Sequence, residues 1–186
     1  GFNHPNNLHF FRNQFSGQVI ISYGTGTYTG YVFQDNWFDN GSIVGNSNNS
    51  YSNCIFQNNI FYNASSVNGN VSSLVNCNNV VFDHNLWYGP SSGSSVCFAG
   101  ACSLLMLTNN IFVHRNASSN CFNTTFNNNI TFNTDVTAPW SLNGNLNGGG
   151  NVANQDPQMV DQASVNNGTN DPLLNLVITM VTKMVA

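Results

Sequence analysis

The chain has 186 residues, of which 41% are hydrophobic and only 5% are charged, and its formal net charge at pH 7 is −4. The hydrophobic content is enough for the core of one domain and argues against disorder. The charged residues are seven Asp, two Arg and one Lys, so no basic patch can neutralise phosphates, which disfavours nucleic acid binding. A surface of uncharged polar residues is typical of a secreted, extracellular or cell-surface protein, or of one that packs against copies of itself.

A ten-residue pattern recurs six times in the first 133 residues. Its copies span residues 8–17, 31–40, 54–63, 80–89, 105–114 and 124–133. We call the third residue of each copy its anchor; the anchors are Phe10, Phe33, Phe56, Phe82, Leu107 and Phe126. They are separated by 23, 23, 26, 25 and 19 residues, a period typical of stacked repeats in which one unit cannot bury its apolar face alone.

Two further columns of residues keep the same register. Three residues after each anchor stands an Asn, which gives Asn13, Asn36, Asn59, Asn85, Asn110 and Asn129. Five residues after each anchor stand Phe15, Phe38, Phe61, Trp87, Phe112 and Thr131. Five of these six are aromatic in a chain that is 12% aromatic, so the register is not a coincidence of composition. Stacking the copies would place these side chains one above another, as aromatic columns and a ladder of asparagine amides.

Alternation within each copy predicts short strands. The residue two before the anchor is apolar in most copies, so a period of two directs it and the anchor into the core. The odd step to the second aromatic residue requires a bend, and we expect the ladder Asn to form it in a left-handed conformation. A second corner rich in Gly and Asn follows seven residues after the anchor. Further strands are expected at residues 19–21, 42–44, 71–75 and 96–98, whereas the fifth interval, 115–121, is expected to be too short to hold one.

Three strands and three turns per coil predict an all-β fold. We expect a right-handed, single-stranded parallel β-helix of about six coils of 19–26 residues, followed by a C-terminal coil or cap. The apolar strand, Asn turn and second inward apolar residue resemble the short parallel β-helix repeat of the pectate-lyase-like superfamily, over residues 1 to about 133. That superfamily includes lyases, glycosidases, adhesins, phage tailspikes and non-catalytic surface proteins, so the resemblance implies the fold and no single function. The Asn-rich, charge-poor style is similar to that of secreted bacterial surface proteins.

The chain is expected to form one domain. The coils should occupy residues 1–133, and an irregular terminal coil or cap should occupy residues 134–186. The segment 150–161, which reads Gly-Asn-Val-Ala-Asn-Gln-Asp-Pro-Gln-Met-Val-Asp, is similar to one that often follows the last full coil in this superfamily. Residues 173–186 are too few and too polar to span a bilayer. Since the chain begins at Gly1 without a signal peptide, we interpret it as a mature product or a fragment of a longer array.

The five cysteines leave two alternatives open. Cys77, Cys102 and Cys121 each stand five residues before an anchor, and coils stacked about 4.8 Å apart would allow a disulfide between neighbours. Cys97 and Cys102, which flank a short loop, are another plausible pair. Alternatively the cysteines, Cys54 included, are buried free thiols that act as small hydrophobic residues.

Candidate functional groups stand at outward positions, one and two residues after the anchor. Arg12 and Asp35 should be neighbours on adjacent coils and close enough to pair, while Asp83 and His84 share one coil. In a polysaccharide site, Asp35 and Asp83 would be calcium ligands or acid and base, and Arg12 or His84 would abstract a proton. A glycosidase needs two carboxylates that flank the bond and a lyase of this fold needs an acidic cluster, but the Asp residues are scattered. No other cofactor or metal site is predicted, because the remaining histidines fall in different columns: His4, His9 and His114.

The sequence therefore favours a non-catalytic, extracellular structural or adhesive β-helix segment, such as a stalk, a fibre subunit or a surface passenger. Expected partners are copies of itself or neighbouring repeats of a longer chain, because few like charges oppose packing; carbohydrate is a further candidate. The alternative is a polysaccharide lyase, glycoside hydrolase or carbohydrate-binding module of the pectate-lyase type. The register also predicts that Asn59→Ala costs about 1 to 3 kcal/mol, and that Asn58→Ala, at an outward position, has almost no effect.

Overall fold

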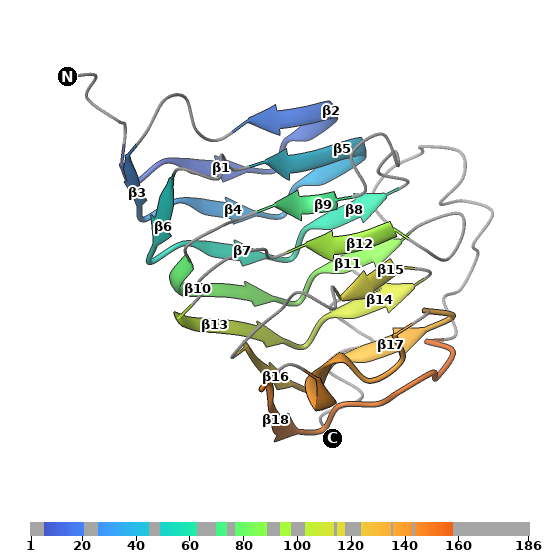
Figure 1. Ribbon diagram of the computed structural model, residues 1–186. Helices are drawn as coiled ribbons and strands as arrows, with labels where there is room; N and C mark the ends of the chain where they lie inside the picture. The colour runs from blue at the N-terminus through green and yellow to red at the C-terminus, as the bar shows by residue number, and fades with distance from the viewer. Residues whose placement is uncertain are drawn as a thin grey trace.

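The computed structural model describes residues 6–20, 26–44, 49–62, 70–73, 77–88, 94–97, 103–113, 115–117, 124–134, 136–142 and 144–157. These residues form short parallel strands stacked one above another (Figure 1). The described ranges contain no α-helix; their helical structure is one 3-10 turn, η1 (Pro139–Ser141). The predicted all-β parallel β-solenoid is confirmed, while its right-handed sense and its number of coils stay predictions.

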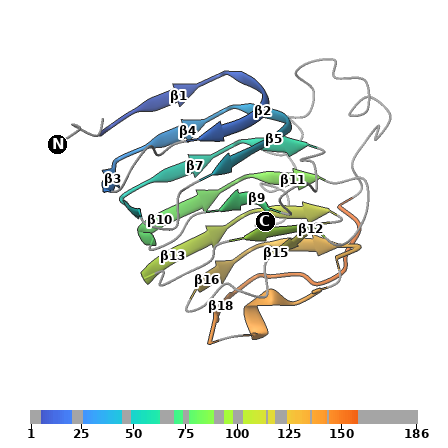
Figure 2. The same cartoon turned by 45° about the horizontal axis from the view of Figure 1, so that its top comes forward.

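The anchors lie in the first stack of strands. In spatial order it consists of β1 (His9–Phe11), β4 (Val32–Gln34), β7 (Ile55–Gln57), β10 (Cys77–Asp83), β13 (Ser103–Thr108), β16 (Thr124–Asn127) and β18 (Leu146–Gly149) (Figure 2). Each anchor pairs with the next one along the stack, from Phe10 with Phe33 to Leu107 with Phe126. The predicted register is therefore the register of the sheet.

Two further stacks of strands accompany the first. The second consists of the first halves of β2 (Gln14–Ile20) and β5 (Trp37–Val44), followed by β8 (Ile60–Tyr62), β11 (Leu86–Tyr88), β14 (Ile111–Val113) and β17 (Ile130–Phe132). The third continues from the second halves of β2 and β5 into β9 (Asn70–Ser73), β12 (Ser94–Cys97) and β15 (Arg115–Ala117). Two short strands, β3 (Thr27–Thr29) and β6 (Ser50–Ser52), pair with each other and lead to the start of β10.

The expectation that the interval 115–121 is too short to hold a strand is wrong, because this interval contains β15. Three residues are enough, because Arg115 to Ala117 pair one to one with the first three residues of β12. Once the preceding coil supplies a template, a short segment can add to its ladder without forming a strand alone. The length of an interval therefore does not decide whether it contains a strand.

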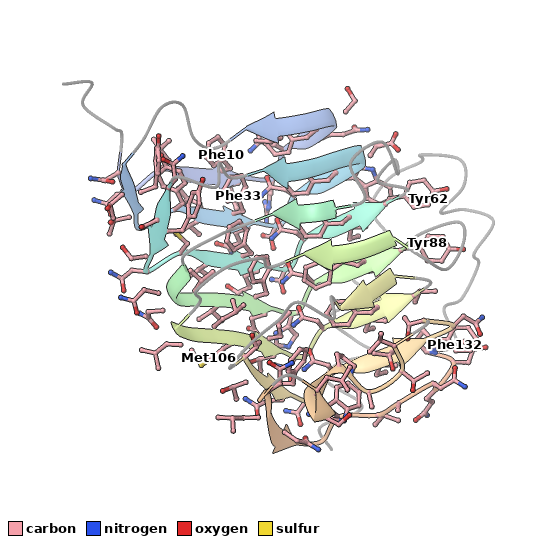
Figure 3. All side chains as sticks on the ribbon, viewed as in Figure 1. Phe10, Phe33, Tyr62, Tyr88, Met106 and Phe132 are labelled. Carbon is pink, nitrogen blue, oxygen red and sulfur yellow. The ribbon has the colours of Figure 1, made fainter. Side chains whose placement is uncertain are left out.

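Stacked aromatic rings fill the space between the first two stacks (Figure 3). In the anchor column, Phe10, Phe33, Phe56 and Phe82 stack with ring centroids 4.5, 5.2 and 4.3 Å apart. The second column runs Phe15, Phe38, Phe61, Trp87 and Phe112, with centroids 4.9, 4.7, 5.2 and 4.8 Å apart. These distances lie close to the spacing of β-strands, about 4.7 to 4.9 Å, because backbone pairing sets the approximate separation of the rings.

A second apolar cluster, which the sequence analysis did not predict, lies on the other face of β8, β11, β14 and β17. Its buried members are Ile60, Leu86, Ile111, Val113 and Ile130. They alternate with the inward rings along each strand, so they belong to the opposite face. Partly buried aromatic side chains flank them, and Figure 3 shows three of these along one side of the stack: Tyr62, Tyr88 and Phe132.

The stacked register extends beyond Asn133, where the expected terminal coil or cap begins. The strand β18 pairs with β16, and Val152 forms a bridge with Ile130. In this last level a Cβ at Gly148 would lie 1.6 Å from Asn127 Oδ1, so any other residue there would require the Asn127 side chain to move. Residues 173–186 are outside the described part. Within that part, no helix has the length and hydropathy needed to cross a bilayer.

Candidate functional site

The inward asparagines form one continuous ladder of hydrogen bonds. In each rung, the main-chain N–H and side-chain Nδ2 donate to Oδ1 of the next Asn, over 2.9–3.2 Å. From the second rung on, Nδ2 also donates to the anchor carbonyl of the preceding coil, over 2.8–2.9 Å. Asn36, Asn59, Asn85, Asn110 and Asn129 are fully buried. Each buried amide is therefore paired, which removes the cost of burying it alone.

Asn151 is a seventh rung that the sequence analysis missed. Its Oδ1 accepts from both nitrogens of Asn129, and its Nδ2 donates to the Phe126 carbonyl. The pairing of β16 with β18 shifts by one residue after Phe126. Asn147 pairs with the anchor Phe126, and the extra residue places Asn151 four residues after Asn147 instead of three. A rule of fixed spacing therefore misses Asn151.

The bend between strands differs from the expected one. The left-handed residue is the one before each ladder Asn, and the ladder asparagines are not among the residues with positive φ. The left-handed column, with φ between 52° and 57°, is Arg12, Asp35, Asn58, His84, Asn109 and Asn128. The reversal of the backbone at this residue is what directs the next side chain inward. Because Arg, Asp and His stand here as well as Asn, composition does not mark the position.

This left-handed column carries Arg12 and Asp35, two of the candidate catalytic residues. Arg12 Nε lies 3.9 Å from Asp35 Oδ2, as the register predicts for neighbours on adjacent coils. Asp35 Oδ1 also accepts a hydrogen bond of 3.1 Å from Asn58 Nδ2. The Arg12 side chain is 74% exposed, and its guanidinium lies over the Phe11 ring, so the ion pair is a surface pair of small energetic value.

Asp83 and His84 form the second candidate pair. His84 Nδ1 lies 2.9 Å from Asp83 Oδ1, within ion-pair distance but without hydrogen-bond geometry. The same Asp83 Oδ1 accepts a hydrogen bond from Asn109 Nδ2 at 2.9 Å, and Asp83 Oδ2 accepts one from Gln57 Nε2 at 3.4 Å. Amides of the coils on both sides therefore hold the carboxylate, two contacts that the sequence analysis did not predict.

The structure does not bring the two pairs together into one group. Asp35 directly follows β4, and Asp83 is the last residue of β10. Because β7 lies between these two strands, the two carboxylates stand two strand spacings apart, about 10 Å. This exceeds the separation of about 5 to 5.5 Å in retaining glycosidases. Across the described residues, no three His, Cys, Asp or Glu side chains gather at one point, and calcium binding stays a prediction. His9 packs against the Phe11 ring, while His4 and His114 lie outside the described residues.

One inner corner holds three tyrosines and a free cysteine. Tyr28 packs against Tyr31 and Tyr51, and the Cys54 thiol donates to the Ser52 carbonyl over 3.4 Å. Burial raises the pKa of Tyr31 to about 12, and burial also raises the pKa of the Cys54 thiol. Cys54 thus fits the alternative of a buried free thiol. The side chains of the other cysteines lie outside what the structure describes: Cys77, Cys97, Cys102 and Cys121.

Neither a protein-family model nor a curated protein matches this chain.

Proposed function

We propose that this chain is a non-catalytic, extracellular structural or adhesive β-solenoid segment, such as a stalk, a fibre subunit or a surface passenger. The observation that carries the proposal is the unbroken ladder from Asn13 to Asn151, flanked by stacked aromatic rings. A ladder of this kind fixes each coil on the next, which suits a rigid spacer. The chain's scarcity of charge supports a place outside the cytoplasm.

The contacts of the candidate carboxylates support a structural role for them. Asp35 accepts from Asn58, and Asp83 accepts from Gln57 and Asn109, each on a neighbouring coil. A carboxylate that is held on two sides by amides joins coils along the outer surface. In this role the charge of Asp83 matters less than its two acceptor oxygens.

Polysaccharide binding or cleavage is the second candidate, favoured by the short distance from Asp83 to His84. The two functions differ in one measurement: a polymer of uronic acid is incubated with the protein and calcium, and the absorbance of unsaturated products is followed. We expect no increase. An increase that is lost in His84→Ala but kept in a matched left-handed, outward variant that contacts neither Asp83 nor His84, Asn53→Ala, would establish a lyase and refute the proposal.

Location has its own test. If the protein is at the cell surface, protease added to intact cells of the source organism should remove it while a cytoplasmic marker remains intact. Protection of both proteins from the protease would refute an extracellular role.

A further inference from the structure

The outward surface of the second stack of strands is broadly apolar, and we call it the outer apolar face. It consists of two columns of side chains on β5, β8, β11, β14 and β17, which stand four and six residues after the anchors. These side chains alternate with the inward ladder Asn and the inward ring, so they point away from the core (Figure 3). The first column is Trp37, Ile60, Leu86, Ile111 and Ile130, and the second contains Tyr62, Tyr88, Val113 and Phe132.

The outer apolar face is shielded from water, although it points outward. Ile111 on this face and Ile55 on the outward surface of the first stack both have an aliphatic residue on each side in the ladder. Ile55 is 42% exposed, whereas Ile111 is 1% exposed. Neighbours within a sheet therefore do not bury an outward isoleucine, and the shielding of Ile111 requires a further layer over the sheet.

The described elements do not supply this layer. Among the described residues, β8, β11, β14 and β17 pack chiefly against strands of their own sheet, and η1 packs against β16 and β18. The layer reaches β5, where the indole nitrogen of Trp37 is shielded from water, and it reaches β17, where Ile130 is 3% exposed. It therefore covers five neighbouring strands, a height of about 19 Å.

One segment outside the described residues has the composition to cover this face. In residues 173–186, ten of the fourteen residues are Leu, Val, Ile, Met or Ala. The loops that directly continue β8 and β11, residues 63–69 and 89–93, consist mostly of Asn, Ser and Gly. Covering an apolar face is favourable only when apolar surface is buried on both sides, and these two loops offer too little of it.

The chain path brings this segment within reach of the face. Val152 forms a bridge with Ile130, and the Gln155 main-chain N–H donates to the Thr131 carbonyl, so the chain leaves the described part beside β17. The intervening residues 158–172 can span about 50 Å when extended, which exceeds the height of the face. Residues 173–186 can therefore lie along all five strands.

We infer that residues 173–186 dock on the outer apolar face and form a second core with it. The segment carries Lys183, the only Lys in the chain, and Asp39 is the one charged residue among the described residues of the face, at its β5 end. The two sides are thus complementary in charge as well as in hydrophobicity. The docked segment keeps a large apolar surface away from water and from other proteins. This docking is independent of the proposed function, because a lyase would need the same cover.

Photo-crosslinking identifies what covers the face. The photoreactive residue p-benzoylphenylalanine replaces Tyr88 on the outer apolar face or, as a matched control, Ile55 on the outward surface of the first stack. After irradiation and digestion with chymotrypsin, mass spectrometry should find residues 173–186 joined to position 88 and not to position 55. The absence of this product, with crosslinks only to residues 63–69 or 89–93 or to a second chain, would overturn the inference.

Hydrogen exchange measures the docking with matched pairs of substitutions. Leu176→Asp with Met180→Asp charges two apolar residues that share one face in a helix and in a strand, whereas Asn175→Asp with Thr179→Asp charges two polar residues at the same spacing. The first pair should make amide exchange in residues 173–186 at least about tenfold faster, the effect of weakening a contact by about 1.4 kcal/mol, while the amides of β7 and β10 stay protected. The second pair should leave exchange unchanged.

The emission of Trp37 reports on the face itself. Leu176→Asp with Met180→Asp should shift the tryptophan emission to longer wavelength, because the Trp37 indole becomes exposed to water, and adding Trp37→Phe should abolish the shift. Equal exchange of residues 173–186 in the wild type and in both pairs would overturn the inference. An emission shift that persists in Trp37→Phe would likewise show that the segment does not dock on this face.

Discussion

Asn59 is the rung at which the ladder can be tested most directly. Its Oδ1 accepts from Asn36 N and Asn36 Nδ2, both at 3.0 Å, and its Nδ2 donates to the Phe33 carbonyl and to Asn85 Oδ1. Asn59→Ala removes all four hydrogen bonds. Asn36 Nδ2 keeps the Phe10 carbonyl as an acceptor, but the Asn36 main-chain N–H is left buried and unpaired.

The expected loss of stability follows from these four hydrogen bonds. A stranded buried donor costs about 1 to 3 kcal/mol, and the three other lost bonds raise the expected destabilisation by Asn59→Ala to about 2 to 4 kcal/mol. Asn13→Ala is the matched control at the open end of the ladder, where the side chain donates only to Asn36 Oδ1 and the Phe11 carbonyl. It strands no buried group, so its cost should stay below about 1 kcal/mol.

Asn58→Ala is the second control, and the structure changes its expected effect. Asn58 has a φ of 54° and donates to Asp35, so alanine there would adopt a left-handed conformation that costs about 1 to 2 kcal/mol. Urea unfolding monitored by circular dichroism, with equal slopes required for comparison, measures the three variants. Equal losses for Asn59→Ala and Asn13→Ala, or the largest loss for Asn58→Ala, would refute the ladder as a source of stability.

Two further predictions concern a left-handed leucine and a buried tyrosine. Leu104 has a φ of 55° and is 68% exposed, so Leu104→Asn should raise the free energy of unfolding by about 1 kcal/mol. Leu142→Asn, at an exposed residue with a φ of −112°, should give no such gain in urea unfolding; equal gains would contradict the backbone argument. Because burial raises the pKa of Tyr31 from 10.0 to about 12, its phenol stays neutral in the fold while the unfolded chain ionises. Its stabilising contribution should be complete below pH 10 and fall between pH 10 and about 12, and Tyr31→Phe should flatten this decline in alkaline urea titrations; an unchanged decline would contradict the assignment to Tyr31.

The sequence by itself determined the stacking register. A strand repeated at nearly constant spacing must place equivalent side chains one above another, so the columns of Phe33 and Phe38 and the ladder through Asn36 could be predicted from periodicity. The same register placed Arg12 beside Asp35, and the structure gives the distance between them as 3.9 Å. Periodicity is informative here because backbone pairing between coils transmits it unchanged through the whole stack.

Only the tertiary structure decided features that break the repeat or depend on contacts between coils. The one-residue shift before Asn151, the short strand β15 and the amide contacts of Asp83 have no counterpart in a regular pattern. The left-handed corner likewise accepts Arg, Asp and His as well as Asn, because the paired strands on either side impose the conformation. A repeat fixes which residues are neighbours, but the backbone path arises only when the coils are stacked.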